Sequence, residues 1–194
     1  IVDDAKLGLE CIYDGLQSDK CEAKNYKKVI RVIKFNDKED IQYQVTYRDT
    51  ITLKETTVKC SHVIFATGPF TDQVMEELNI DWSPVVLPSK GTHLWLENDS
   101  LPIKNSMVLQ TKDKRIIFVI PQRNSILVGT TEDPIDPKED ILNLEPTQKE
   151  IDYLLDVVNQ YFPKNHITQK NILSSFSGVR PLIRSSSSSS KTSR

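Results

Sequence analysis

The sequence predicts an α+β fold in which antiparallel strands outnumber helices. Residues 41–47 alternate apolar and polar side chains, which is typical of a strand with one wet face. Further short β-rich segments separated by turns follow between residues 82 and 129. Apolar residues at helical spacing are confined to three stretches, so helices are expected to be the minor component.

The first part of the chain predicts a helix followed by a β-meander. One apolar stripe at three- and four-residue steps is formed by Val2, Ala5, Leu9, Ile12 and Leu16. After a polar linker at 18–27, three antiparallel strands are expected at residues 29–33, 41–47 and 51–60.

Residues 62–66 form a continuous apolar run rather than an alternating one. Such a run predicts a strand buried on both faces, as in a parallel sheet. The run ends at Thr67 and Gly68, after which Thr71 is expected to cap a short helix that extends to Leu78.

The second part of the chain predicts a sheet and one strong helix. Strands are expected at residues 85–88, 91–96, 106–110, 115–121, 125–129 and 171–179. An acidic loop at 132–146 precedes a capping box formed by Thr147 and Glu150, and Pro163 ends the helix. The serine run inside residues 185–194 predicts a disordered tail.

Composition narrows the possible functions. The chain has 194 residues and a net charge of -2, so no basic field points to nucleic acid. Its three cysteines and three histidines are scattered, which gives no metal-ligand spacing. No apolar stretch approaches the roughly 20 residues of a membrane-spanning helix. The six glycines include no Gly-x-Gly, so the usual dinucleotide-binding loop is missing.

Five short blocks, in this order, resemble the FAD-dependent glycerol-3-phosphate dehydrogenases, which belong to the D-amino-acid-oxidase-like flavoproteins. They are residues 2–7 (Val-Asp-Asp-Ala-Lys-Leu), 66–70 (Ala-Thr-Gly-Pro-Phe), 88–93 (Pro-Ser-Lys-Gly-Thr-His), 128–133 (Val-Gly-Thr-Thr-Glu-Asp) and 177–182 (Ser-Gly-Val-Arg-Pro-Leu). Together they span nearly the whole chain except the serine-rich tail.

The resemblance implies an internal fragment of such an enzyme, with FAD as cofactor. Residues 1–81 would be part of the FAD-binding α/β domain without its Gly-rich βαβ unit, and residues 82–184 an antiparallel substrate domain. It also implies that Ala66, Thr67 and Gly68, together with Gly129 and Thr130, lie beside the flavin. The isolated chain is expected to be inactive and not to retain FAD.

The resemblance further implies that Lys90, His93 and Arg180 bind the substrate, with His93 and Arg180 acting in catalysis. A neutral imidazole can accept the hydroxyl proton of the substrate. A guanidinium offers a planar fork of donors that matches phosphate oxygens. From the residues alone, a hydrogen-bonded structural histidine and an arginine in a surface ion pair remain open.

The implied reaction is oxidation of sn-glycerol 3-phosphate to dihydroxyacetone phosphate, with quinone or oxygen as final electron acceptor. The implied location is the mitochondrial inner membrane, peripherally bound, in a eukaryote, or otherwise the cytoplasmic membrane face. Two alternatives stay open: a related flavoprotein oxidase that acts on an amine or amino acid, and a non-catalytic α+β binding module.

Overall fold

The computed structural model describes residues 3–37, 40–135 and 139–184, and the chain divides into two compact units. The first unit combines Ile1–Phe65 with Met75–Asp81, and the second combines Ala66–Val74 with Trp82–Arg194. One cut falls at the predicted boundary after residue 81, but residues 66–74 group with the second unit instead of the first. The predicted disordered tail at 185–194 lies outside the described residues.

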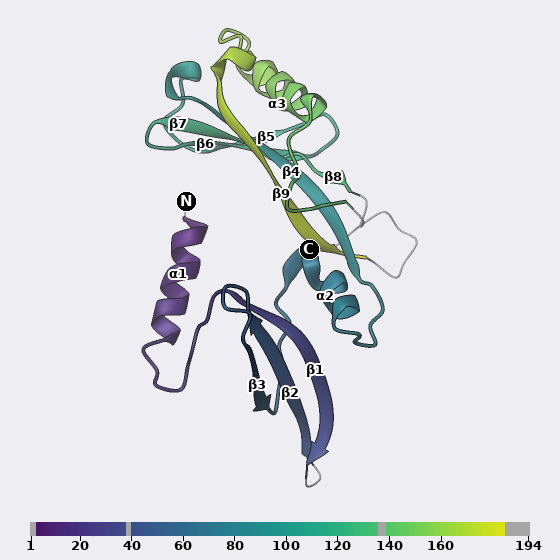
Figure 1. Cartoon of the computed structure of the whole chain (residues 1–194). Helices are drawn as coiled ribbons and strands as arrows, with labels where there is room; N and C mark the ends of the chain where they lie inside the picture. Colours follow the sequence, from purple (N-terminus) through teal and green to yellow (C-terminus); the bar gives the residue numbers. More distant parts are fainter. Residues whose placement is uncertain (1–2, 38–39, 136–138, 185–194) are drawn as a thin grey trace. The chain divides into compact units, whose positions relative to one another are not determined.

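The first unit holds helix α1 (Asp4–Gly15) and a three-stranded antiparallel sheet of β1 (Lys27–Asp37), β2 (Asp40–Asp49) and β3 (Glu55–Cys60), as Figure 1 shows. Asp3 caps α1 by accepting a hydrogen bond from the Lys6 N–H. The helix and meander are therefore confirmed, although none of the residues of α1 is buried and its apolar stripe faces solvent. Val2, the first predicted member of that stripe, lies outside the described residues.

The predicted buried strand at 62–66 is wrong. These residues are irregular, and the Ile64 side chain is 89% exposed. A strand needs a neighbour that completes its backbone hydrogen bonds, and no strand in the described parts of the chain pairs with this segment. The short helix that follows is confirmed as α2 (Thr71–Glu77), which a 3-10 turn η1 (Gly68–Phe70) precedes. The predicted cap is wrong, because Thr71 is itself helical and its hydroxyl donates to the Gly68 carbonyl.

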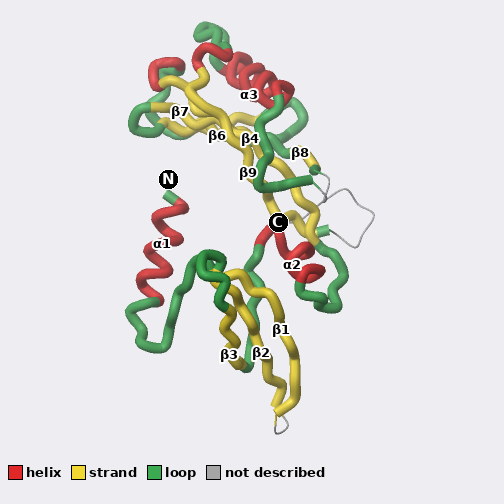
Figure 2. Tube along the Cα trace, viewed as in Figure 1, coloured by secondary structure: helices red, strands yellow, loops and turns green. Residues whose placement is uncertain are grey.

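The second unit is built on a six-stranded antiparallel sheet (Figure 2). The path runs through β5 (Met107–Gln110), β6 (Ile116–Pro121), β7 (Ser125–Gly129), β4 (Val86–Glu97) and β8 (Asp133–Pro134), and β9 (Ile172–Ile183) also pairs with β4. The predicted strands at 85–88 and 91–96 are thus one strand, because β9 pairs with β4 along its full length. The two-residue strand β8 was missed inside the predicted acidic loop, since so short a strand leaves no alternation to detect.

Helix α3 (Gln148–Tyr161) packs on one face of this sheet (Figure 1). The predicted capping box is present: the Thr147 side chain accepts from the Glu150 N–H, and the Glu150 carboxylate accepts from the Thr147 N–H. Apolar side chains of α3 and the sheet form the core. Its fully buried members include Leu94, Leu96, Ile117, Val119, Val128, Leu154 and Val158.

The unit has two further 3-10 turns, η2 (Asn98–Ser100) and η3 (Gln169–Asn171). Within the described ranges, no helix is long and apolar enough to cross a lipid bilayer.

Candidate functional site

The side of the second unit's sheet that points away from α3, named the open face here, carries a continuous cross-strand row. The register aligns residues from β5, β6, β7, β4 and β9 in the order Val108, Phe118, Gly129, His93 and Phe176. Side chains alternate along each strand, so these residues lie opposite the α3-packed set that includes Leu94 and Val128. Val108 is 62%, Phe118 45% and Phe176 43% exposed. The row is thus an accessible apolar strip with a histidine in it.

His93 is held within this row by contacts with two neighbours. Its ring lies over Gly129, where an added Cβ would meet His93 Cδ2 at 2.3 Å. The ring also stacks on Phe176, with centroids 5.0 Å apart and an interplanar angle of 8°. The fit therefore depends on Gly129 having no side chain.

The electrostatic setting of His93 favours the neutral ring. Its Nδ1 atom is buried and has no hydrogen-bond partner among the described residues. Burial, and then the positive charge of Arg180, lower the pKa of His93 below its ordinary value of 6.5. A neutral imidazole is suited to accept a proton from a bound molecule.

Arg180 lies on the same face, and its guanidinium is fixed by the backbone and side chains beneath it. Nη2 donates to Thr130 Oγ1 at 2.9 Å, and Nη1 donates to the Thr131 carbonyl at 3.3 Å. The guanidinium lies over Gly91, where an added Cβ would meet Nη1 at 2.4 Å. These contacts hold a planar cation in place, which is the arrangement that binds phosphate or carboxylate well.

Ala66, Thr67 and Gly68 precede and enter η1, which packs against β4 and β9, the two strands that carry His93 and Arg180. Gly68 has φ +55°, a backbone conformation that favours glycine. Asp72 of helix α2 accepts hydrogen bonds from the N–H groups of Val85 and Val86. These bonds hold the beginning of α2 against the first residues of β4. Arg180 pairs with Ser89 of β4, and Ser89 lies between Val86, the first residue of β4, and His93.

Lys90 is separated from this group by the alternation of the strand. Its side chain is 8% exposed, and its ammonium forms an ion pair with Glu150 at 2.8 Å on the α3 side of the sheet. It also donates to the Glu145 carbonyl. The predicted substrate contact of Lys90 stays a prediction, and this geometry favours a structural role instead.

The structure thus brings Gly129 and Thr130 together with His93 and Arg180, since Gly129 lies under the histidine and Thr130 contacts the arginine. Sequence reasoning missed Gly91, Thr131 and Phe176 as members of the site. Phe176 lies on the strand predicted at 171–179 and precedes Arg180 by four residues, which was an available signal, because continued alternation places both on the same face. The pairing across strands had no local signal.

Comparison with known proteins gives a consistent result. A family model described as "FAD dependent oxidoreductase" matches residues 2–190. The chain is 32% identical over 166 residues to a "Probable glycerol-3-phosphate dehydrogenase, mitochondrial" of Dictyostelium discoideum, covering 82% of this chain and 26% of the relative. It is 33% identical over 183 residues to an "Alpha-glycerophosphate oxidase" of Enterococcus casseliflavus, covering 93% of this chain and 29% of that relative.

Among solved structures, the chain is similar to a glycerol-3-phosphate dehydrogenase from Bacillus halodurans complexed with FAD. The TM-score is 0.80 at 30% sequence identity, and the match covers 94% of this chain and 36% of the solved one. The chain therefore spans about a quarter to a third of the length of the curated relatives that it matches.

Proposed function

This chain belongs to the FAD dependent oxidoreductase family, and on that premise we propose that it supplies the substrate-binding sheet of a flavin enzyme. The proposed reaction oxidises sn-glycerol 3-phosphate to dihydroxyacetone phosphate. The observation that carries the proposal is the presence of His93 and Arg180 on one face of the same sheet, above the two glycines Gly129 and Gly91. The names of the relatives support this choice of substrate.

The residues of the open face fit a flavin cofactor. The row from Phe118 to Phe176 offers an exposed apolar surface, Gly129 makes room for the His93 ring within it, and the buried His93 Nδ1 has no partner among the described residues. When bound, FAD supplies the acceptor for the hydride of the substrate. Gly129 and Thr130 are the proposed contacts in the sheet, and Ala66, Thr67 and Gly68 are proposed to contact the nucleotide part.

His93 is proposed to take the proton from the C2 hydroxyl of glycerol 3-phosphate. The proton moves from the hydroxyl oxygen to a ring nitrogen, and Nε2 is the proposed acceptor because Nδ1 is buried. The lowered pKa of His93 keeps the ring neutral and able to accept at neutral pH. The stacking on Phe176 fixes the plane of the ring, so the acceptor direction is set before the substrate binds.

Arg180 is proposed to hold the phosphate. Its guanidinium is held by contacts with Thr130 and Thr131 and is partly buried. A guanidinium held in this way binds a phosphate dianion through charge and paired hydrogen bonds, and so places the carbon chain of the substrate relative to His93.

A second substrate class is favoured by the same arginine, because a carboxylate fits a guanidinium fork as well as a phosphate does. The test is anaerobic mixing of the holoenzyme that contains this chain with glycerol 3-phosphate, sarcosine or D-alanine. We expect glycerol 3-phosphate to bleach the flavin absorbance. Bleaching by either amino acid, with none by glycerol 3-phosphate, would reject the proposal in favour of an amine or amino-acid oxidase.

The electron acceptor is proposed to be oxygen or a quinone, and the oxidase among the relatives supports oxygen as one possibility. A peripheral membrane location is proposed, and the name of the Dictyostelium relative supports a mitochondrial one in a eukaryote. The alternative of a non-catalytic binding module gains no support from the family match.

A further inference from the structure

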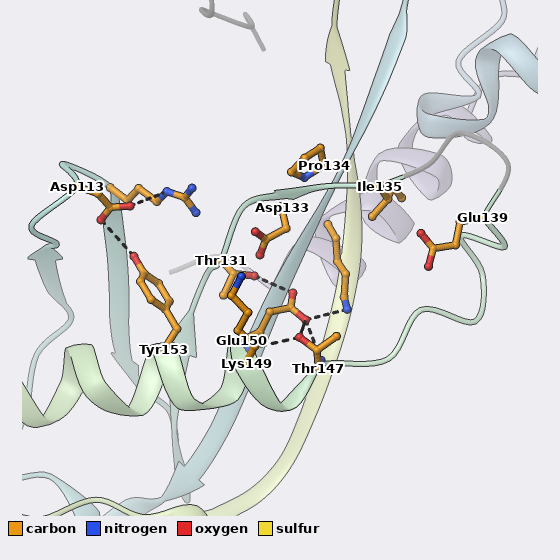
Figure 3. Close-up of a pocket in the computed structure, with 12 residues that line it drawn as sticks. Asp113, Thr131, Asp133, Pro134, Ile135, Glu139, Thr147, Lys149, Glu150 and Tyr153 are labelled. Atoms are coloured by element: carbon orange, nitrogen blue, oxygen red, sulfur yellow. Dashed lines mark hydrogen bonds and ion pairs between the residues drawn. The ribbon is translucent and has the colours of Figure 1, made fainter.

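The α3 side of the sheet contains a buried carboxylate, Glu150. Glu150 lies in the first turn of α3 and is 6% exposed. Its Oε1 accepts from the hydroxyls of Thr92 at 2.7 Å and Thr131 at 3.2 Å. Its Oε2 accepts from the Lys90 ammonium at 2.8 Å and from both the N–H and the hydroxyl of Thr147. Glu150, Thr131 and Thr147 line a pocket of about 420 Å³, and Figure 3 draws the side chains that line it.

Thr131 connects this carboxylate with the open face. The Thr131 hydroxyl donates to Glu150 and accepts the Thr92 N–H at 2.9 Å. The Thr131 carbonyl accepts from Arg180 Nη1 and also from the Thr130 hydroxyl at 3.0 Å. The Thr130 hydroxyl oxygen in turn accepts from Arg180 Nη2. A single residue therefore separates the Glu150 carboxylate from the groups that hold the guanidinium.

The floor beneath Arg180 is fixed by the same carboxylate. Lys90 and Thr92 are the two chain neighbours of Gly91, over which the guanidinium lies, and both donate to Glu150. Thr92 also shares a hydrogen bond with Ser177 on β9, the strand of Arg180, at 2.9 Å. Glu150 thus fixes the segments on which Arg180 rests from the opposite side of the sheet.

We infer that Glu150 is a positioning residue for Arg180: acting through Thr131, Thr130 and the strand around Gly91, it sets where the guanidinium meets the substrate phosphate. This inference rests on the proposed function. It differs from a purely structural role in one measurable respect, because positioning changes phosphate recognition in protein that remains folded.

The experiment uses the holoenzyme that contains this chain and measures competitive inhibition by inorganic phosphate, KM for glycerol 3-phosphate, flavin content and Tm. For Glu150→Gln we expect the inhibition constant of inorganic phosphate and the KM to rise together by roughly 10-fold, the range found when supporting residues of a site are changed. The flavin content should stay at the wild-type level. Asp156→Asn, an exposed carboxylate of the same helix, is the matched control and should change neither constant.

Glu150→Gln leaves Lys90 buried without its charged partner, so a second pair of variants keeps the inference testable if that protein does not fold. Thr131→Val removes the hydroxyl that donates to Glu150 and accepts the Thr92 N–H, whereas Thr131→Ser retains it. We expect Thr131→Val to weaken inhibition by phosphate several-fold, on the order of 3- to 10-fold, and Thr131→Ser to restore the wild-type value.

The inference is overturned if every folded variant among Glu150→Gln and Thr131→Val binds inorganic phosphate as the wild type does, even with a lower Tm, while Arg180→Gln loses that binding. Glu150 would then be structural only. If Arg180→Gln also binds phosphate normally, or the wild type does not oxidise glycerol 3-phosphate, the proposed function has failed, and the inference fails with it.

Discussion

The two faces of the six-stranded sheet carry different kinds of side chains, although the same strands form both. On the α3 side, Leu94, Leu96 and Val128 are fully buried and Lys90 and Thr92 are bound to Glu150. On the open face, the intervening positions are Gly91, His93 and Gly129, and the Arg180 guanidinium and the His93 ring lie over the two glycines. Strand alternation thus assigns stability to one face and proposed chemistry to the other, within a few consecutive residues. Substitutions in the apolar core on the α3 side and on the open face should therefore separate stability from activity, whereas Glu150 and Thr131 connect the two faces.

The largest effect is expected from Arg180→Gln in the holoenzyme. The phosphate would lose its charged partner, so kcat/KM for glycerol 3-phosphate should fall by about 1000-fold, as for loss of one partner of a tightly held ion pair. Thermal unfolding should change little, because the arginine is not part of the α3 core. Steady-state kinetics and calorimetry on the same sample test this separation. A large fall in Tm would place Arg180 among the residues that hold the fold together.

The matching substitution on the other face is Leu154→Ala. Leu154 is completely buried, and its truncation leaves a cavity that should lower the free energy of unfolding by about 3 kcal/mol. Enzyme that remains folded should keep its KM for glycerol 3-phosphate. Denaturant unfolding and kinetics at low temperature measure the two quantities. A KM changed as strongly as in Arg180→Gln would mean that the two faces are not separable.

Gly129→Ala tests whether the histidine depends on the glycine beneath it. The new methyl group would lie 2.3 Å from His93 Cδ2, so the ring must move, and a misplaced acceptor should lower kcat by roughly 100-fold. Gly15→Ala, at the end of α1, is the control, since an added Cβ there meets nothing within 4 Å. Single-turnover reduction of the flavin measures both variants. Equal rates in the two variants would contradict the close fit of His93 over Gly129.

The pH dependence should differ between the two faces. Burial raises the pKa of Glu150, but hydrogen bonds from Lys90, Thr147 and Thr92 outweigh it and lower the pKa from 4.5 to about 2. Because the folded pKa is the lower one, the carboxylate stabilises the fold above pH 4.5, and this contribution is lost as pH falls from 4.5 towards 2. Stability measured against pH should decline over that window in the wild type and less steeply in Glu150→Gln.

On the open face, the pKa of His93 is lowered first by burial and then by Arg180. Protonation of the ring should reduce kcat/KM at acidic pH, with an apparent pKa below 6.5. Removing the arginine charge removes one cause of the shift, so the acidic limb of the profile should move to higher pH in Arg180→Gln. This is the smallest effect predicted, and a limb that stays in place would argue against electrostatic contact between the two residues.

Local patterns in the sequence predicted the elements whose stability is local. The structure contains the predicted capping box of Thr147 and Glu150, the hairpins and the strand that ends at Gly129. Caps, turns and strand alternation depend on residues that are close in the sequence, so the sequence is sufficient to predict them. The strand predicted at 62–66 does not form, since its apolar run gives no information about a pairing partner. The motif at 88–93 also led to the prediction that Lys90 and His93 share one site. In the structure their side chains lie on opposite faces of β4, because side chains alternate along a strand.

The contacts within the site could not be predicted from residues that are neighbours in the sequence. Phe176 reaches His93, and Thr131 reaches Arg180, only because β4 pairs with β7 and β9 in one particular register. Residues about 80 positions apart meet across that register, for example His93 and Phe176. His93 and Arg180 could be predicted as site residues because imidazole and guanidinium groups have few chemical roles. The importance of Gly129 and Gly91 is visible only in the structure, where these two side chains lie over them.

The most direct test of the central claim is a crystal structure of the holoenzyme with glycerol 3-phosphate or dihydroxyacetone phosphate bound. We predict the phosphate within about 3 Å of the Arg180 guanidinium and the C2 oxygen at a similar distance from a ring nitrogen of His93. A phosphate bound instead on the α3 side of the sheet, beside Lys90 and Glu150, would contradict the assignment of chemistry to the open face.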